Sequence, residues 1–326
     1  QIAGLQNGRS IEVMYYNADL LSGAGLGTPT TWAEFENACQ ATTSAGISGT
    51  VVSVDASHFV NWLWSHGGEV LSSDMDYARF AEQPGIDALL VFQRLIDGGY
   101  ARLVQAYYED MTAFGMGEAV FTFGSSAGIP YYRMAMEGGA NDAWGVTHVP
   151  AVAGYEVVDS YGAGHGILAH NEAEDRAAWI FIKWLADTEQ TARWSALSGY
   201  FPVRISATTH PSITQKLTSD LQYAQAYNLI SLGRSEPGVR GYDAIRGMIN
   251  TAMYATLRDG QEVTSTLQTA SASADELLDE TGPESAVIPP AGGEFIYTNT
   301  QDLQVAVQFP PGSFALTQTV SYVPLI

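Results

Sequence analysis

The sequence has little cysteine and little positive charge. Cys39 is the only cysteine among 326 residues, so the chain can form no internal disulfide bond. It lies in a helical pattern with no base beside it to activate a thiol, and we expect a small buried residue. Lys183 and Lys216 are the only lysines, and 35 acidic residues against 14 basic ones give a formal charge of −21. Nucleic acids and anionic membranes attract clustered Lys and Arg, so this balance argues against both as partners.

Long hydrophobic runs are also missing. No apolar stretch is long enough to cross a membrane, and no signal peptide is recognisable. The composition, with 46% hydrophobic and 15% charged residues, is typical of a globular protein large enough for two domains. The chain begins abruptly at Gln1 and ends at Ile326 in a strand-like segment, so we interpret it as part of something longer.

Complete motifs for catalysis or for a bound metal are absent as well. No two of the six histidines have the spacing of a His-Glu-x-x-His zinc site. Residues 124–128 (Gly-Ser-Ser-Ala-Gly) have the spacing of a nucleophile elbow, but this short pattern alone is not a complete catalytic motif, and residues 162–166 lack the spacing of a dinucleotide-binding loop. Asp74 and Asp76 lack the remainder of a calcium loop. We therefore predict a protein without enzymatic activity, cofactor or catalytic metal.

The chain up to residue 281 mixes strands with helices. Thr31 and Glu34, for example, predict a capping box at the start of a helix. Mixed strands and helices without strict βαβ repetition favour an α/β protein with lobes. Strands are expected at 11–16, 49–54, 117–123, 144–149 and 161–168. Helices are expected at 32–44, 57–65, 84–96, 108–116 and 172–191, followed by all-helical sequence over 213–279.

The pattern changes after residue 281. Three prolines, Pro283, Pro289 and Pro290, mark a linker over 282–293. Residues 294–326 alternate apolar and polar side chains as strands do, and they resemble the start of a cell-surface β-sandwich domain. We expect a separate β-strand tail there.

Several segments carry a resemblance to a known family. Met14–Leu21 (Met-Tyr-Tyr-Asn-Ala-Asp-Leu-Leu) followed by Trp32-Ala-Glu-Phe35 resembles the central part of family 1 extracellular solute-binding proteins, which include the maltose and glycerol-3-phosphate binding proteins. The resemblance covers residues 8 to about 280. Four later segments follow in the family's order and spacing: Gly67–Leu71, Phe114–Phe121, Trp144–Pro150 and Gly199–Arg204.

This resemblance implies a two-lobed, periplasmic-binding-protein-like α/β fold of type II that closes on a small solute by a hinge motion. It also implies delivery of that solute to the permease of an ABC importer, in the periplasm or at the cell surface, with a lipid or domain anchor. Lobe two then comprises residues 14–148 and 203–281. Lobe one comprises 1–13 and 151–202 and is incomplete, because the family has a sizeable segment before the residue that matches Gln1.

Placement within the family pattern selects candidate ligand-binding residues. Trp62 and Trp64 fall where aromatic side chains line the cleft in relatives, although core packing explains a buried tryptophan equally well. Ser125 and Ser126 follow the strand at 117–123, where they either bind ligand or cap the next helix. The remaining candidates are Gly162 and His165 in a glycine-rich strand, Tyr200 in a turn, and Arg240, which resembles the position where phosphodiester-binding relatives hold an anion.

Two classes of ligand and one different role stay open. Aromatic faces suit sugar rings, so we expect a carbohydrate first and a glycerophosphodiester second. The different role is structural: the solute-binding fold would serve as a subunit of a cell surface or filament, and its tail at 294–326 would pair with neighbouring subunits through strand edges.

Overall fold

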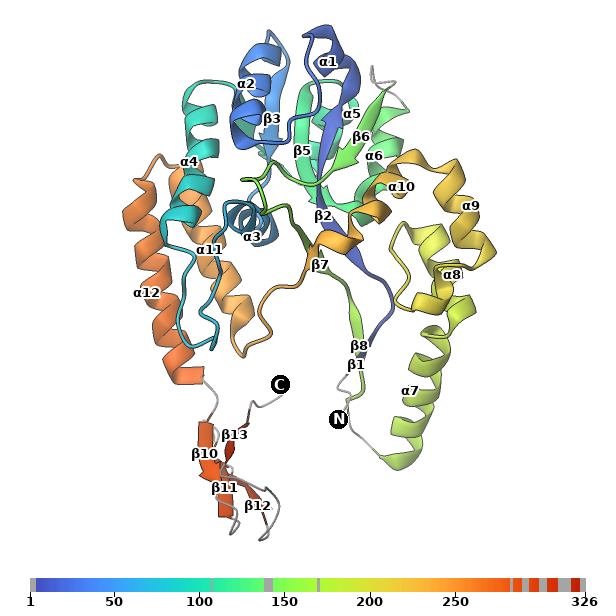
Figure 1. Cartoon of the computed structure of the whole chain (residues 1–326), viewed down its shortest axis with the longest axis vertical. Helices are drawn as coiled ribbons and strands as arrows, with labels where there is room; N and C mark the ends of the chain where they lie inside the picture. Colours follow the sequence, from blue (N-terminus) through green and yellow to red (C-terminus); the bar gives the residue numbers. More distant parts are fainter. Residues whose placement is uncertain are drawn as a thin grey trace.

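The computed structural model describes residues 4–106, 108–137, 143–168 and 171–281, together with four strands nearer the C-terminus. Figure 1 shows a sheet at the centre with helices on both sides. Strands and helices are mixed along the chain, which confirms the predicted α/β class.

A seven-stranded mixed sheet forms the centre of the molecule. Its strands are β2 (Ser10–Asn17), β3 (Ser48–Val52), β4 (Ala101–Leu103), β5 (Ala119–Ser125), β6 (Trp144–Thr147), β7 (Val158–Tyr161) and β9 (Gly233–Arg234). The strand order is β4-β3-β5-β2-β7-β9, and β6 also pairs with β2. β2 runs antiparallel to β5, β6 and β7, whereas β3 runs parallel to β4 and β5. β2 is therefore the strand on which the two halves of the sheet meet.

Helices cover both faces of this sheet, and β2 contributes side chains to two cores. Met14 belongs to one core, where Trp62 stacks on Phe92 with ring centroids 3.8 Å apart. The next residue, Tyr15, belongs to the opposite core and stacks on Tyr132 at 3.8 Å, because successive side chains of a strand point to opposite faces.

The first core is enclosed by α2 (Trp32–Thr42), α3 (Ala56–Ser65), α4 (Gln83–Asp97), α11 (Tyr242–Leu257) and α12 (Val263–Thr281). The second is enclosed by α5 (Glu109–Gly115), α6 (Ile129–Met136) and α10 (Leu221–Asn228).

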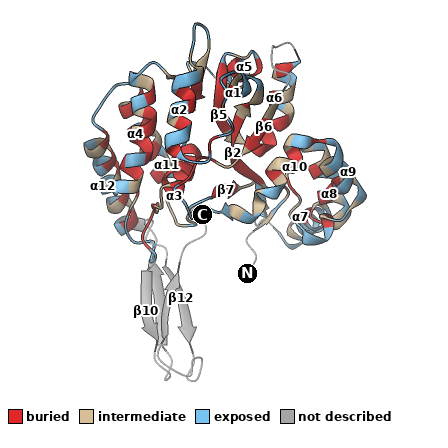
Figure 2. Ribbon diagram, turned by 45° about the horizontal axis from the view of Figure 1, so that its top comes forward, coloured by how far each residue is buried: buried red, intermediate tan, exposed pale blue. Residues whose placement is uncertain are grey.

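Figure 2 shows the buried residues concentrated in the sheet and on the inner faces of these helices. Cys39 on α2 is fully buried, and burial raises the pKa of its thiol well above the usual range. The backbone of α2 passes so close to β3 that a Cβ on Gly49 would lie 2.5 Å from the Cα of Cys39. The cysteine therefore has the packing role that its sequence context predicts.

Local sequence signals account for the starts of several helices. The hydroxyl of Thr31 accepts the backbone N–H of Glu34 at 3.2 Å, and the Glu34 carboxylate accepts the N–H of Thr31 at 3.1 Å, which confirms the predicted capping box. Asn17 caps α1 (Ala18–Gly23) by accepting the N–H of Leu20. Asp55 caps α3 by accepting the N–H of Ser57 at 2.8 Å. The last cap fixes the first turn of α3 beside β2.

The glycine-rich segment predicted as one strand over 161–168 is divided in the structure. β7 ends at Tyr161, and a separate strand β8 (Gly164–Gly166) pairs with β1 (Gly4–Gln6) in a two-stranded sheet. Gly162 stands at the division, and a Cβ there would lie 2.2 Å from the carbonyl oxygen of Gly8. Glycine is required at this point because two backbone segments pass in close contact.

Two helical predictions were also too long. The helix expected over 172–191 ends at Leu185, and after Asp187, which is extended with φ −68° and ψ 153°, a second helix begins. Aspartate favours such positions before a helix because its side chain competes for backbone hydrogen bonds within one. The two helices are α7 (Glu172–Leu185) and α8 (Thr188–Ser198). The stretch 213–279 is likewise interrupted, because β9 lies between α10 and α11 and pairs with β7.

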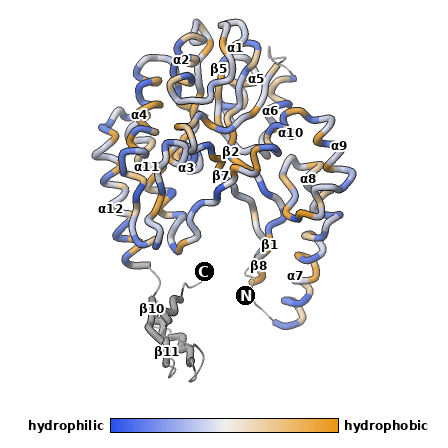
Figure 3. The backbone as a smooth tube through the Cα atoms, viewed as in Figure 1, coloured by the Kyte–Doolittle hydropathy of each residue, from blue (hydrophilic) through white to orange (hydrophobic). Residues whose placement is uncertain are grey.

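Helices α7 to α9 form a smaller group beside the sheet. Ala192 of α8 packs with Ala207 and with Ile213 of α9 (Pro211–Ser219), so the segments on either side of residue 203 share a small core. α7 extends away from this group, and Figure 3 shows hydrophobic stretches along it. Phe181 and Trp184 on α7 keep 56% and 49% of their surface exposed. An apolar face of α7 is therefore uncovered within the described residues.

The four C-terminal strands confirm the predicted β character of the tail. β11 (Gly293–Thr298) and β12 (Gln304–Phe309) form an antiparallel hairpin. β13 (Gln318–Tyr322) pairs with β10 (Glu284–Ile288), which lies inside the segment expected to be a linker. Across the described part of the chain, no helix has the length and apolar character needed to span a membrane.

Candidate functional site

A cavity of about 570 Å³ lies where β2, β5 and β7 meet the first turn of α3. Its walls combine carboxylates, hydroxyls and ring faces, which is the composition of a polar small-molecule site. The aromatic part consists of Phe123, Tyr132, Tyr161 and Tyr200. The polar part consists of Ser10, Glu12, Ser53, Asp55, Ser57, His58, Asp110, Ser125, Glu236 and Arg246.

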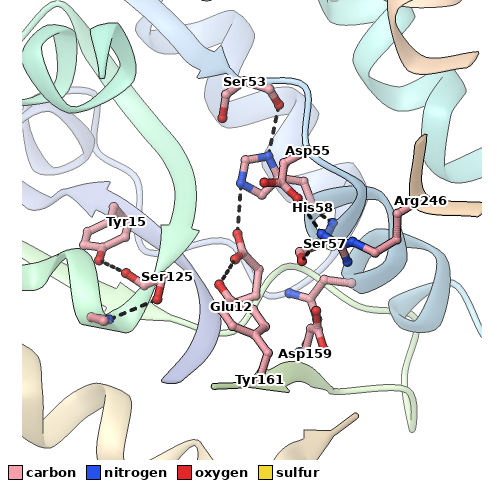
Figure 4. A network of polar contacts seen from close by, with 12 residues as sticks. Glu12, Tyr15, Ser53, Asp55, Ser57, His58, Ser125, Asp159, Tyr161 and Arg246 are labelled. Atoms are coloured by element: carbon pink, nitrogen blue, oxygen red, sulfur yellow. Dashed lines mark hydrogen bonds and ion pairs between the residues drawn. The ribbon is translucent and has the colours of Figure 1, made fainter. Parts of the chain in front are cut away.

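Glu12 of β2 lies at the floor of this cavity and is 1% exposed. Its carboxylate pairs with Nε2 of His58 at 3.1 Å and accepts the hydroxyl of Tyr161 at 2.8 Å. The other ring nitrogen of His58, Nδ1, lies 3.0 Å from the carbonyl oxygen of Ser53. Figure 4 shows His58, Glu12 and Tyr161 in one line of contacts that joins α3, β2 and β7.

His58 carries a positive charge at neutral pH. Burial alone would lower its pKa, but the charge of Glu12 and the hydrogen bond to it outweigh burial and raise the pKa to about 9. The protonated ring donates from both nitrogens, to the Glu12 carboxylate and to the Ser53 carbonyl. Glu12 and His58 therefore form a compensated ion pair in the cavity floor rather than a proton-transfer pair near neutrality.

A second polar group lies where α11 approaches β7. Arg246 donates to Glu236, to Oδ1 of Asp55 at 3.2 Å and to the hydroxyl of Ser57 at 3.1 Å. The Ser57 hydroxyl in turn donates to Glu236 at 3.2 Å. Figure 4 shows Arg246 reaching toward Ser57 and Asp55 from the helix opposite. Arg246 thus links the first turn of α3 to α11.

Asp159 of β7 is fully buried beneath this second group. Burial, together with the neighbouring carboxylate of Glu236, raises the pKa of Asp159 to about 9. Its backbone N–H donates to Oδ1 of Asn61 at 3.0 Å, which ties β7 to α3. Burial therefore favours the neutral carboxylic acid form of the Asp159 side chain.

The charges lining the cavity do not cancel. Four carboxylates, from Glu12, Asp55, Asp110 and Glu236, face the cations of His58 and Arg246. Both cations are already engaged by carboxylates of the same walls. The cavity therefore offers many hydrogen-bond acceptors and a net negative field, and it has no uncommitted cation in its described lining.

Three of the candidate residues line the cavity: Ser125, Gly162 and Tyr200. The Ser125 hydroxyl accepts the N–H of Ala127, so the residue both caps the following turn and borders the cavity. The close approach of the Gly8 backbone leaves no room for a side chain at position 162. This contact accounts for Gly162 without any role in ligand binding. Tyr200 borders the cavity, and its side chain lies against Gly8, just before β2.

The other candidates lie elsewhere. Trp62 is fully buried in the core behind α3 and does not border the cavity. Ser126 is buried, and its hydroxyl accepts the N–H of Ile11. His165 lies on β8 opposite Leu5 of β1, beyond the cavity.

Trp64 borders a different cavity of about 490 Å³, next to the loop that follows α3. The guanidinium of Arg234 lies over its ring, 4.5 Å from the centroid, and Arg234 also pairs with Glu69. Arg240 precedes α11 and borders neither cavity. The arginine that reaches the main cavity is Arg246, about one turn into that helix.

Sequence reasoning missed the residues that carry the charge of the site. Glu12 stands in an otherwise apolar strand and His58 in an aromatic helix, and both contexts read as core. One usable signal existed, because a charged residue in a buried strand requires a partner. No group of three or more His, Cys, Asp or Glu side chains is arranged to hold a metal ion within the described ranges.

The mixed sheet, its covering helices and the polar cavity at their junction define a protein that binds small molecules without a catalytic constellation. The family model of bacterial extracellular solute-binding proteins matches residues 2–219 of the chain. This chain belongs to that family, and its members act outside the cytoplasm, in the periplasm or at the cell surface. The predicted absence of enzymatic activity agrees with the non-enzymatic character of the family.

Individual relatives agree with this assignment. A binding protein of Brucella abortus (strain 2308) is 24% identical over 293 residues, which are 84% of this chain and 67% of that protein. The GacH receptor of Streptomyces glaucescens, solved unliganded and with acarbose, superposes with a TM-score of 0.75 at 18% identity, covering 85% of this chain and 71% of that one. UgpB from Mycobacterium tuberculosis, solved with glycerophosphocholine, superposes with a TM-score of 0.74 at 23% identity. The match covers 84% of this chain and 70% of UgpB. These likenesses confirm the predicted fold, and none supports the structural-subunit alternative.

Proposed function

We propose that the protein captures a neutral, polyhydroxylated solute of the carbohydrate class in the cavity above Glu12 and delivers it to the permease of an ABC importer. The observation that carries this proposal is the lining of the cavity. Carboxylates and serine hydroxyls there outnumber cations, and the rings of Tyr161 and Tyr200 border the same space. A sugar presents hydroxyl donors to such acceptors and apolar C–H faces to such rings.

The same lining argues against a glycerophosphodiester. A phosphodiester anion needs a cation or several backbone N–H groups that are free to receive it. Arg246 is engaged by Glu236 and Asp55, and His58 is engaged by Glu12. An anion in this cavity would meet Asp110 as well, and its repulsion would not be compensated. UgpB binds glycerophosphocholine, but at 23% identity it shows the shared fold alone.

Ligand capture by closure of two lobes, with lobe two at 14–148 and 203–281 and lobe one at 1–13 and 151–202, is part of the same proposal. β1, β8 and α7 extend from the sheet on one side of the cavity, and Figure 1 shows them below the sheet, beside the N-terminus. The exposed face of α7, with Phe181 and Trp184, is an apolar surface that suits contact with further α/β structure of lobe one. Anchoring to the cell surface and pairing of the C-terminal strands with a neighbour belong to this proposal too.

The direct test is calorimetric titration of the purified chain with a panel of neutral monosaccharides and disaccharides, polyols, and glycerophosphocholine. We expect one neutral sugar to bind at micromolar concentration or tighter and glycerophosphocholine not to bind. An Asp55→Asn variant removes one acceptor and weakens that binding. The matched control is Asp97→Asn, on the far end of α4 and outside the cavity. Binding of glycerophosphocholine alone would refute the carbohydrate proposal.

A further inference from the structure

Two carboxyl groups, those of Asp159 and Glu236, meet beneath the polar cavity. Asp159 is fully buried, and neither of its carboxylate oxygens receives an N–H or O–H donor from a described residue. Oε2 of Glu236 is buried without a donor as well, whereas its Oε1 pairs with Arg246. The single charge of Arg246 is further divided, because the guanidinium also pairs with Asp55 at 3.2 Å. A buried carboxylate that lacks both donor and counter-charge is strongly destabilising, so this pair requires one more positive charge.

The pairing of β7 with β9 brings the two carboxyl groups together. Asp159 lies in the part of β7 that pairs with β9, and the hydroxyl of Ser235 donates to the carbonyl oxygen of Ser160 at 3.2 Å. The chain therefore stays beside β7 as far as Glu236, whose carboxyl group comes within hydrogen-bond reach of Asp159. Such a bond needs a proton on one of the two, because an ionised carboxylate only accepts. Burial and the charge of Glu236 accordingly raise the pKa of Asp159 to about 9.

The other titratable groups around the pair leave this requirement in place. Tyr242 of α11 and Tyr161 of β7 stay neutral, because burial raises the pKa of each hydroxyl above its usual range. Glu12 of β2 adds a negative charge, which His58 of α3 compensates. A proton shared within the pair satisfies both the missing charge and the missing donor.

A bound solute changes the surroundings of this pair. Glu236 borders the main cavity, and 13% of its side-chain surface is exposed. Its Oε1 already accepts from Arg246 and from the hydroxyl of Ser57, so a solute replaces water around Glu236 more than it adds donors. Loss of water favours the protonated form of a carboxyl group. The solute-bound protein therefore holds the proton more tightly than the empty protein, and by linkage the proton strengthens solute binding by the same factor.

We propose that Asp159 and Glu236 share one proton, and that this proton makes solute capture pH-dependent, with tighter binding at lower pH. The proton keeps Glu236 beside β7, where it holds Arg246 and Ser57 in the wall of the cavity. When the proton is lost, two adjacent buried carboxylates repel each other and the wall loses this support. The inference rests on the proposed function and goes beyond it by adding regulation of the same site.

The first test compares the parent with Asp159→Asn from pH 6 to pH 9. Both are titrated calorimetrically with the tightest-binding sugar from the panel of neutral monosaccharides and disaccharides. Binding to the parent should weaken as pH rises through the pKa of the pair in the empty protein. A loss of about tenfold corresponds to pKa values one apart in the empty and the sugar-bound protein.

Asp159→Asn should behave as a permanently protonated parent, because the asparagine amide donates to Glu236 at every pH. It should bind as the parent does at pH 6 and more tightly than the parent at pH 9, which a merely structural role of Asp159 would not produce. His58 also titrates near pH 9, but both proteins contain it, so the difference between them belongs to the pair. Asp97→Asn, at the end of α4, is the matched control and should follow the parent.

A second measurement needs no variant. Titrations of the parent at pH 8 in two buffers with different enthalpies of ionisation give the number of protons taken up as the sugar binds. We expect net uptake in the parent and a smaller uptake in Asp159→Asn. Equal pH dependence and equal proton uptake in the two proteins would overturn the shared proton and leave the proposed function intact. Tighter sugar binding with added sodium, at constant pH and ionic strength, would place a metal cation there instead and would also overturn it. Absence of binding by every sugar at every pH would overturn both proposals.

Discussion

Nε2 of His58 lies 3.1 Å from Oε1 of Glu12, and both side chains are almost wholly removed from solvent. The pair joins the first turn of α3 to the central strand of the sheet. Isolated charges in such a place are strongly destabilising, and a compensated pair is tolerated. The floor of the ligand cavity therefore depends on two residues that stabilise each other.

Replacing Glu12 by glutamine should destabilise the protein. It leaves the buried imidazole of His58 without its counter-charge, and breaking a buried pair in this way costs about 3–5 kcal/mol. The free energy of unfolding, measured by urea denaturation at pH 7, should fall accordingly. The pKa of His58, followed by NMR, should fall from about 9, because burial is then opposed only by the charge of Asp55 and the hydrogen bond to Ser53. Glu118→Gln, at an exposed carboxylate, is the control, and an equally small change in both variants would contradict the pairing.

The pH dependence of stability should follow the two groups with raised pKa values. His58 moves from 6.5 to about 9 and Asp159 from 3.8 to about 9, so the folded protein holds protons that the unfolded chain releases. Stability from these groups is therefore complete below their unfolded pKa values. It falls as pH rises, from about pH 4 for Asp159 and from about 6.5 for His58, until both have titrated near 9.

The variant Asp159→Asn isolates one of these contributions. Asparagine has the shape of the protonated acid and does not titrate, so the decline of the unfolding free energy between pH 5 and pH 8 should become shallower. Chemical denaturation at several pH values measures this slope. Asp97→Asn, at a helix end far from the cavity, should leave the slope unchanged. A parent protein whose stability rises steadily from pH 5 to pH 9 would contradict the assignment.

A side chain at position 162 should disturb both the fold and the site. The Cβ of Gly162→Ala would lie 2.2 Å from the carbonyl oxygen of Gly8, and backbone atoms cannot yield as a side chain does. We expect a loss of about 1–3 kcal/mol in unfolding free energy, the scale of overpacking, and weaker sugar binding because Gly162 borders the cavity. Gly164→Ala is the control, since the nearest atom there is 3.8 Å away. Equal behaviour of the two variants would show that the contact is not limiting.

The sequence predicted best what depends on near neighbours. The capping box joins Thr31 to Glu34, three residues later in the chain. It depends on these near neighbours and not on residues brought together by the fold. The charged site joins residues far apart: Tyr161 meets Glu12 across 149 positions, and only the assembled sheet creates that contact. The family resemblance correctly selected Ser125 and Tyr200 as residues that line the cavity. It also selected Arg240, but the arginine that lines the cavity is Arg246. Arg240 lies before Gly241, the left-handed residue at which α11 begins, whereas Arg246 lies within that helix.

Trp62 and Trp64 should respond differently to substitution, because the structure separates them. Trp62 stacks on Phe92 in the core, so Trp62→Ala should cost about 3–5 kcal/mol of stability, the scale of emptying a large aromatic site. Trp62→Phe keeps part of that packing and should remain folded, and its sugar affinity should equal that of the parent because Trp62 does not border the cavity. Trp64→Phe should likewise retain sugar binding in the main cavity, since Trp64 borders the neighbouring space beside Arg234. Urea denaturation and calorimetric titration of each variant separate the two quantities. If Trp62→Phe bound sugar tenfold more weakly while its stability stayed within about 1 kcal/mol of the parent, Trp62 would contact the ligand in the closed protein, and its assignment to the core alone would be wrong.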